Sequence, residues 1–356
     1  MDLANSKVGF PELKANILTR GLSLENSENK GGAGPTGRYV ILPNGVFSTA
    51  PTYWNDENDP FTLKVEEDKR YIVFRDKELR ISFPEEPSFY GKKTSDGVEM
   101  KKVALLHAKN CLATTTYQDC VFFAEGKECK FCGIRESLRN NKTIKEKKPS
   151  QLVEVAEESD RATHATLTTG IMPNKNEHEK LSRISKALKK KTDLDVHVQL
   201  SNPGRSELEE LYSSGVDTVG VHLETWDKKT LREVCPGKAE IGREEMLDSM
   251  KNAVGVFGEN QVSSYLIAGI GEDKQKFLEG VDVISETGTV PFIVPFHPIP
   301  HTPLSNNPLP KPGYMIDIYR EAAEILRDNN IEPSKSKAGC VRCGACSAIK
   351  EFKNFK

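Results

Sequence analysis

The sequence predicts an α/β protein built around a partial (β/α)6 barrel of the TIM type, with a β-rich N-terminal extension and a cysteine-rich tail. Three observations favour this fold class. The 356 residues suit one barrel with added segments, apolar strand segments alternate with amphipathic helical ones, and the β-rich pattern is confined to the first third of the chain. Strict alternation indicates parallel strands joined by right-handed crossovers.

Residues 1–101 are expected to form the extension. Residues 1–34 are polar and end in a glycine- and proline-rich run, which makes a long regular element improbable there. Between residues 38 and 100, apolar and polar residues alternate with period two, which predicts a small β-rich region that acts as a cap or a binding platform. Its strand segments are RYVILP (38–43), FTLKVEE (61–67), KRYIVFRD (69–76) and ELRISFP (78–84).

Residues 102–330 carry the barrel pattern, and residues 331–356 form the tail. The predicted strands are VALLH (103–107) or LATTTY (112–117), then HATLTTG (164–170), DVHVQL (195–200), DTVGVHL (217–223), QVSSYLIAG (261–269) and VPFIVPFH (290–297). Helices are predicted at 149–158, 177–190, 205–215, 242–258, 274–288 and 312–330. Functional residues are expected at the carboxyl ends of the strands.

Charge and hydropathy exclude several classes of protein. The chain has 50 Lys and Arg against 52 Asp and Glu, a net charge of -2, so it lacks the basic excess typical of a nucleic-acid binder. We find no basic stretch followed by an apolar run at the start and no run of 18 apolar residues, which predicts a cytoplasmic protein without a membrane partner. In that compartment, clustered cysteines are more often metal ligands than disulfides.

Cys120, Cys129 and Cys132 form a C-x8-C-x2-C pattern in the loop after the first barrel strand. We name them the first cysteine group. A closed structural zinc site has four protein ligands, so this group would need Cys111 or a histidine to complete one. Three thiolates are the right number for a 4Fe-4S cluster with one open iron, which can bind S-adenosyl-L-methionine (SAM).

The motifs resemble those of radical SAM enzymes of the biotin synthase and lipoyl synthase kind, over about residues 103–350. The resemblance implies catalytic cluster ligands at Cys120, Cys129 and Cys132, and SAM contacts from residues in CKFC, ATLTTG, VGVHLETWD and IAGIGED. The implied SAM-binding residues are Phe131, Thr168, Thr169, Gly170, His222, Glu224 and Gly269, with Arg243 at the start of a helix. A solvated surface arginine is the alternative for Arg243. The family spacing is C-x3-C-x2-C, so the longer loop here is a departure.

Cys340, Cys343 and Cys346 form the tail cysteine group, C-x2-C-x2-C. Beside a radical SAM barrel, they are interpreted as ligands of a second, auxiliary 4Fe-4S cluster. Spacing leaves the fourth ligand open among Ser347, Cys111, Cys235 and a non-protein sulfur. A zinc knuckle is the alternative for the tail. Cys111 and Cys235 are otherwise expected to be small buried thiols.

GGAGPTG (31–37), FPEEPSFY (83–90) and AGCVRCGACSA (338–348) resemble the archaeal-type two-subunit lipoyl synthases. That resemblance implies a sulfurtransferase of lipoate biosynthesis, which passes sulfur from the tail cluster to an octanoyl chain on a carrier protein or peptide. A companion radical SAM subunit and a ferredoxin-like electron donor are the implied partners. Two alternatives stay open: another radical SAM reaction of cofactor biosynthesis (rearrangement, methylation or dehydrogenation), or a non-enzymatic iron-sulfur or zinc carrier.

Some further residues have weaker signals. His297 and His301 are four apart, but the prolines between them deny a helix, so substrate contact or loop packing is favoured over metal binding. Tyr265 is either a core residue or a catalytic one. The basic run RNNKTIKEKKPS (139–150) is either a solvated face or a docking site for an acidic carrier.

Overall fold

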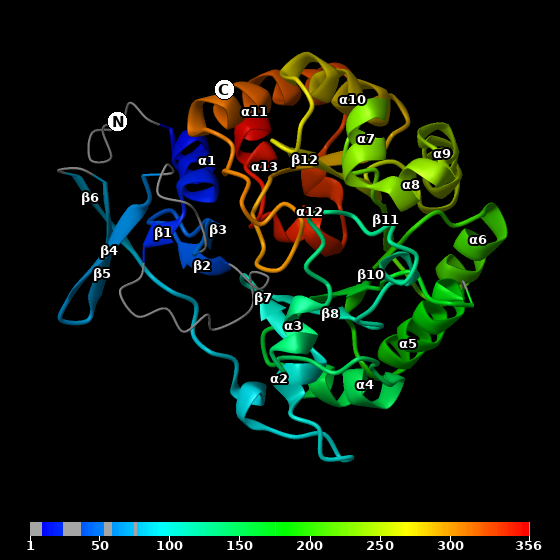
Figure 1. Ribbon diagram of the computed structural model, residues 1–356. Coiled ribbons are helices and arrows are strands. Elements are labelled where there is room, and N and C mark those ends of the chain that lie inside the picture. The colour runs from blue at the N-terminus through cyan, green and yellow to red at the C-terminus, as the bar shows by residue number, and fades with distance from the viewer. Residues whose placement is uncertain (1–8, 24–36, 53–58, 75–76, 175, 356) are drawn as a thin grey trace.

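The computed structural model describes residues 9–23, 37–52, 59–74, 77–174 and 176–355. Its centre is a seven-stranded sheet in the order β13-β12-β11-β10-β9-β8-β7, curved into an open half-barrel (Figure 1). Six strands are parallel to their sequence neighbours, which confirms the predicted partial α/β barrel. They are β8 (Cys111–Thr115), β9 (His164–Thr168), β10 (Asp195–Leu200), β11 (Thr218–Val221), β12 (Val262–Ala268) and β13 (Val290–Pro295).

The seventh strand corrects the prediction for the start of the barrel. VALLH and LATTTY were alternatives for the first strand, but both form strands: β7 (Leu105–His107) pairs antiparallel with β8 at the sheet edge. The chain reverses at Ala108, whose φ of 50° is a turn conformation. The pairing sets His107 opposite Cys111.

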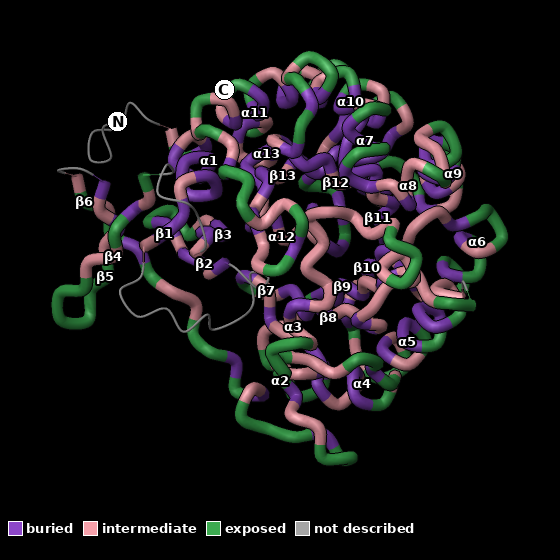
Figure 2. The backbone as a smooth tube through the Cα atoms, in the orientation of Figure 1, coloured by how far each residue is buried: buried purple, intermediate pink, exposed green. Residues whose placement is uncertain are grey.

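Helices cover the outer face of the half-barrel (Figure 1). All six predicted helices form, as α4 (Pro149–Glu157), α5 (Glu177–Lys191), α6 (Arg205–Ser213), α9 (Arg243–Phe257), α10 (Lys274–Glu286) and α11 (Pro312–Asp328). On α5, Leu181, Ile184 and Leu188 follow helical spacing and are buried against the sheet. Figure 2 shows the same division, with buried strands inside and exposed outer helix faces.

Short helices outside the tail that were not predicted are α2 (Met100–Val103), α3 (Glu136–Arg139), α7 (Lys228–Val234) and α8 (Pro236–Ile241). α2 precedes the first barrel strand and the others lie in connections between barrel elements. Each spans at most two turns, too short for a periodic pattern to be visible. No helix in the described part of the chain is long and apolar enough to cross a lipid bilayer.

The N-terminal region contains two small sheets. β1 (Leu22–Ser23), β4 (Phe61–Glu66), β5 (Lys69–Phe74) and β6 (Lys77–Ile81) form one, and the hairpin of β2 (Gly37–Ile41) and β3 (Phe47–Pro51) forms the other. The β-rich region was expected over 38–100, but its last strand ends at Ile81. Residues 31–36 of the glycine-rich run lie outside the described residues.

Helix α1 (Phe10–Arg20) overturns the expectation that residues 1–34 lack a regular element. Pro11 occupies the first turn, where its missing N–H does no harm. Ala15 and Leu18 pack into the barrel core, whereas Leu13 and Ile17 pack against the N-terminal sheets. The helix is stabilised mainly by these tertiary contacts, which a polar sequence window does not reveal.

The tail lies inside the open half-barrel. It forms α12 (Gly339–Cys343) and α13 (Ile349–Asn354), and α12 sits in the centre of the curved sheet, against β9, β10 and β13 (Figure 1). Gly339 has a φ of +83°, and an added Cβ there would come within 2.5 Å of the His197 ring. A glycine is needed at this close approach between the tail and the sheet.

Candidate functional site

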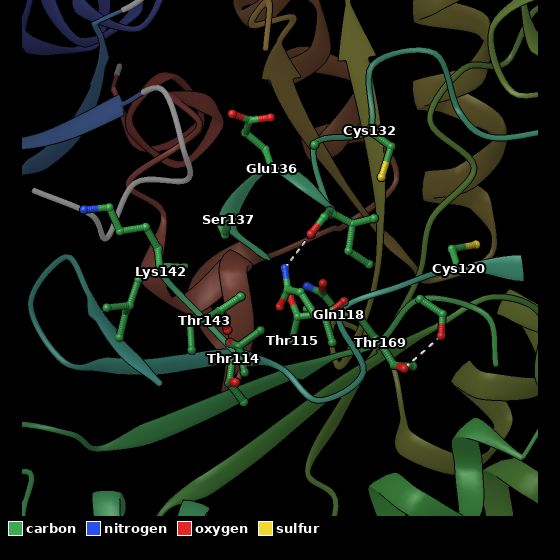
Figure 3. A pocket seen from close by; sticks show the side chains of 18 of the residues that line it. Thr114, Thr115, Gln118, Cys120, Cys132, Glu136, Ser137, Lys142, Thr143 and Thr169 are labelled. Carbon is green, nitrogen blue, oxygen red and sulfur yellow. Dashed lines mark hydrogen bonds between the residues drawn. The ribbon is translucent and has the colours of Figure 1, made fainter. Parts of the chain in front are cut away.

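A cavity of about 1470 Å³ opens inside the half-barrel. It is larger than the roughly 300–1,000 Å³ of a pocket for one small ligand. Both cysteine groups border it, through Cys120, Cys129, Cys132, Cys340 and Cys346. Figure 3 shows Cys120 and Cys132 at one side of this central cavity, with Thr169 and Gln118 close by. Two groups about 200 residues apart in sequence therefore face one space.

The first cysteine group is held by an ordered loop in spite of its long spacing. Asp119 accepts hydrogen bonds from the Cys120 backbone N–H at 2.9 Å and from Arg135 Nε at 2.7 Å. Arg135 also lies over the Phe123 ring at 4.3 Å. The Cys132 N–H donates to the Cys129 carbonyl, which closes a turn between the last two cysteines. The eight intervening residues are thus compatible with three thiols that face the central cavity.

Cys235 lies directly beside this group, at the junction of α7 and α8. Its thiol is fully buried and donates a hydrogen bond to the Cys129 sulfur. This bond lowers the pKa of Cys129 and, together with burial, raises the pKa of Cys235. The sequence analysis expected Cys235 to be a small buried thiol or a fourth ligand of the tail cluster; only the fold brings it to the first cysteine group.

Lys238 is a site residue that sequence reasoning missed. Its Nζ donates to Glu224 Oε1 at 2.5 Å and to the His222 carbonyl at 2.6 Å, and it borders the central cavity. Burial opposes its charge, but Glu224 and the nearby Cys129 and Cys235 outweigh that and raise the pKa of Lys238. A buried cation therefore lies next to the first cysteine group. Lysine in a six-residue helix has no sequence signal for such a role.

His222 lines the central cavity and has one ring nitrogen without a hydrogen-bond partner among the described residues. Its Nδ1 accepts from the Tyr265 backbone N–H at 3.2 Å, so the proton of the neutral ring sits on Nε2. The ring stacks on Tyr265 with centroids 4.3 Å apart. Burial, followed by Lys238 and His197, lowers the pKa of His222 well below its usual value, so the ring stays neutral. Nε2 has no partner among the described residues.

The structure brings most, but not all, of the predicted SAM-binding residues together. Phe131, Thr168, Thr169, Gly170, His222 and Glu224 all line the central cavity. Gly269 and Arg243 are not among its lining residues. Gly269, with a φ of +96°, lies against Pro310. The Arg243 guanidinium stacks 3.7 Å from the Trp226 ring and donates to the Trp226 carbonyl.

Gly170 lies in van der Waals contact with the loop of the first cysteine group. A Cβ at this position would come within 1.8 Å of the Asp119 carbonyl oxygen. We expect Gly170→Ala to displace Asp119 and Cys120, to lower the free energy of unfolding by about 1–3 kcal/mol and to reduce iron binding at the first group. Urea titration and iron analysis check this. Gly313→Ala, where a Cβ meets nothing within 4 Å, is the control that should cause neither change.

The tail cysteine group is partly buried, in polar and aromatic surroundings. The Tyr265 hydroxyl and Gln199 Nε2, at 3.5 Å, donate to the Cys340 sulfur. Thr49 Oγ1 is 3.2 Å from the Cys346 sulfur. Burial raises the pKa of Cys340 to about 11 and that of Cys343 to about 12. Without a metal these thiols are therefore protonated, and metal binding would displace the protons.

Lys14 ties the N-terminal helix to the tail. Its side chain is 1% exposed, and Nζ donates to the Gly344 carbonyl and to Glu351 Oε1, each at 2.8 Å. Gly344 has a φ of +70° and ends α12 between Cys343 and Cys346. The lysine thus holds the turn that separates two cysteines of the tail group. The sequence offered no indication of this contact across more than 300 residues.

Across the described ranges, no three His, Cys, Asp or Glu side chains converge closely enough to hold a single metal ion. The two histidines of VPFHPIPHTPL do not share a site: His297 Nε2 donates to the Leu18 carbonyl at 2.9 Å, whereas His301 Nδ1 lies 3.0 Å from Glu136 Oε2.

Glu272, in the IAGIGED motif, is buried, and burial raises its pKa to about 7 from 4.5. The unfolded chain loses this proton near pH 4.5 and the folded protein only near pH 7. Stability should therefore fall as pH rises between these values, by about 3 kcal/mol in total. Urea titrations from pH 4.5 to 8 measure the slope. In Glu272→Gln the fall in the free energy of unfolding between these pH values should be smaller by this amount. If the variant and the original protein showed the same dependence on pH, Glu272 would not be its cause.

Residues 117–284 match the family model described as the radical SAM superfamily. This stretch carries the first cysteine group, the predicted SAM contacts and Lys238. Residues 117–284 form a radical SAM domain. The tail cysteine group lies outside the matched residues.

The relatives of the radical SAM domain are distant. A bacteriochlorophyllide c C-7(1)-hydroxylase of Chlorobaculum limnaeum is 25% identical over 121 residues, which cover 33% of this chain and 30% of that protein. The chain thus matches less than a third of this curated relative. Among solved structures, methylornithine synthase (PylB) has 16% identity and a TM-score of 0.46 over 62% of this chain and 63% of that one. The hydrogenase maturase HydG from Carboxydothermus hydrogenoformans has 17% identity and a TM-score of 0.49, over 62% and 52%.

Proposed function

We propose that the chain is a radical SAM enzyme that removes a hydrogen atom from a substrate held between two iron-sulfur clusters. The observation that supports this proposal most is the central cavity, because both cysteine groups border it. A cavity of about 1470 Å³ offers room for SAM and for a second molecule. The first cysteine group would hold the cluster that binds SAM, and the tail group would hold an auxiliary cluster.

When bound, a reduced 4Fe-4S cluster supplies the electron that cleaves SAM to methionine and a 5'-deoxyadenosyl radical. The chain's own residues bind and position. Thr168, Thr169 and Gly170 would meet the methionine end of SAM, and Phe131 would lie near its adenine. Glu224, held by Lys238, is in place to orient SAM, and the Nε2–H of His222 is free to donate to whichever molecule occupies the cavity. The tail inside the half-barrel keeps water from the reacting carbon.

We further propose sulfur insertion as the reaction, with an octanoyl chain on a carrier protein or peptide as substrate. Cys340 and Cys346 border the same space as the proposed SAM residues, so a cluster held by the tail group would supply sulfur beside a substrate in the central cavity. The motif resemblance to two-subunit lipoyl synthases points the same way and implies a companion subunit. The basic run at 139–150, whose Lys142 lines the cavity, is a candidate docking site for an acidic carrier.

The second candidate is a radical SAM reaction with a different outcome, such as rearrangement, methylation or dehydrogenation in cofactor biosynthesis. The similarity to a bacteriochlorophyllide hydroxylase favours it, because that relative is named for a modification of a tetrapyrrole. In this case the tail cluster would bind substrate or relay an electron, and its sulfide would stay in place. The two candidates differ in the fate of that sulfide.

The experiment is anaerobic reconstitution with iron and sulfide, followed by assay with SAM, dithionite and an octanoylated lysine peptide, with and without the companion subunit. We expect 5'-deoxyadenosine, a thiolated peptide and loss of sulfide from the tail cluster. Formation of 5'-deoxyadenosine without a thiolated product would overturn sulfur insertion and favour the second candidate. No reductive cleavage of SAM by fully loaded protein would overturn the enzymatic proposal and leave an iron-sulfur carrier.

A further inference from the structure

The spacing of the tail cysteines left the fourth ligand of the proposed auxiliary cluster open among Ser347, Cys111, Cys235 and a non-protein sulfur. The fold removes two of these. Cys235 lies at the opposite site, hydrogen-bonded to Cys129. Ser347 is engaged next to α13, where its Oγ accepts from the Ile349 N–H and its hydroxyl bonds the Tyr319 side chain. The remaining protein group is Cys111.

Cys111 lies on the inner face of the sheet, in the layer that the tail covers. It is the first residue of β8, is 2% exposed, and its sulfur lies 3.2 Å from Thr166 Oγ1. In the strand register Thr166 pairs with His197, and the next inward pair, Thr168 and Gln199, follows two residues later. His197 contacts Gly339, and Gln199 donates to the Cys340 sulfur. In this register Cys111 is opposite His164, two inward-facing layers before the layer of Thr168 and Gln199. Its sulfur reaches Thr166 in the layer between them, on the face of the sheet that Cys340 contacts.

Cys343 approaches Cys111 from the other side. It packs against Tyr39 and Ala108, and Ala108 begins the turn that leads into Cys111. Tyr39 is buried in the same cluster as Ala108 and Ala345, and Ala345 lies between Cys343 and Cys346 in the chain.

We propose that Cys111 is the fourth protein ligand of the auxiliary cluster, so that all four irons of that cluster are bound by cysteines. This inference rests on the proposed two-cluster function. Neither Cys111 nor Cys343 is among the residues that line the central cavity, whereas Cys340 and Cys346 are. The cluster would then present the edge bound by Cys340 and Cys346 to the substrate, and Cys111 would anchor the opposite side to the barrel wall.

The experiment isolates the auxiliary cluster. In the full chain with Cys120→Ala, Cys129→Ala and Cys132→Ala, only the tail site can bind a cluster after anaerobic reconstitution. We expect about four irons per chain in this background. Adding Cys111→Ala should lower the iron content by a quarter or more and change the Mössbauer spectrum. Adding Cys235→Ala, the matched buried thiol, should change neither.

Cys111→Ser controls for folding, because the serine lacks the sulfur but its hydroxyl can keep the hydrogen bond to Thr166. The thermal unfolding of this variant should match that of the background protein. Four irons and an unchanged Mössbauer spectrum in Cys111→Ala would overturn the assignment and leave the two-cluster proposal standing. Absence of iron from the background itself would overturn both. Each result is read from iron content and spectroscopy and does not depend on activity.

Discussion

Replacing Cys129 by alanine is expected to abolish SAM cleavage, whereas replacing the adjacent Cys235 by alanine is expected to leave it intact. Cys235 is buried, Cys129 is partly buried, and the two thiols are hydrogen-bonded to each other. Comparing the two variants therefore tests which of two adjacent cysteines is the cluster ligand. Cys129 borders the central cavity and belongs to the three-cysteine pattern, and a cluster with two protein ligands does not persist. Cys235 would lose only a hydrogen-bond donor to the sulfur.

The measurements are 5'-deoxyadenosine formation and iron content of reconstituted protein. We expect Cys129→Ala to form no detectable 5'-deoxyadenosine and to lose about four of eight irons. Cys235→Ala should retain both clusters, with a changed reduction potential at the first one, because hydrogen bonds to cluster sulfurs tune it. The reverse pattern, with activity lost in Cys235→Ala and kept in Cys129→Ala, would mean that Cys235 is the ligand.

Lys14→Met is expected to lower the free energy of unfolding by about 3 kcal/mol, since breaking a buried ion pair leaves an uncompensated charge. Lys14 is 1% exposed and its partner Glu351 is 19% exposed. The variant also frees the Gly344 carbonyl at the end of α12. We therefore expect loss of iron at the tail group together with the loss of stability, while iron at the first cysteine group stays.

Urea unfolding and iron analysis of the two sites check this prediction. Lys14→Met combined with Glu351→Gln should recover part of the lost stability, because the unpaired charge is removed. Lys64→Met, at an exposed Lys–Glu pair, is the control and should show no measurable change. If Lys14→Met unfolded like the control and kept both clusters, the N-terminal helix would not be needed to hold the tail.

The fold class was predictable because each barrel element carries its own local signal. Apolar five- to seven-residue strands and helices with 3.6-residue periodicity, such as α5 and α11, depend on residues close together in sequence. Helix α1 was missed for the opposite reason: Leu13 and Ile17 are buried against the N-terminal sheets and Leu18 against the barrel core, and a polar window conceals that. VALLH and LATTTY were predicted as alternatives; that both form strands and pair antiparallel depends on a turn at Ala108, where a positive φ on alanine has no sequence signature.

By itself, the sequence determined the α/β barrel, the two groups of three cysteines and many of the residues that line the central cavity, because strand order and motif spacing are local properties. Only the tertiary structure decided that the tail lies inside the half-barrel, that Lys238 and Cys235 adjoin the first cysteine group, and that Lys14 and Cys111 adjoin the tail group. These contacts join residues between about 100 and 340 positions apart. Their stability comes from burial and charge pairing in a packed interior, which exist only once the chain has folded.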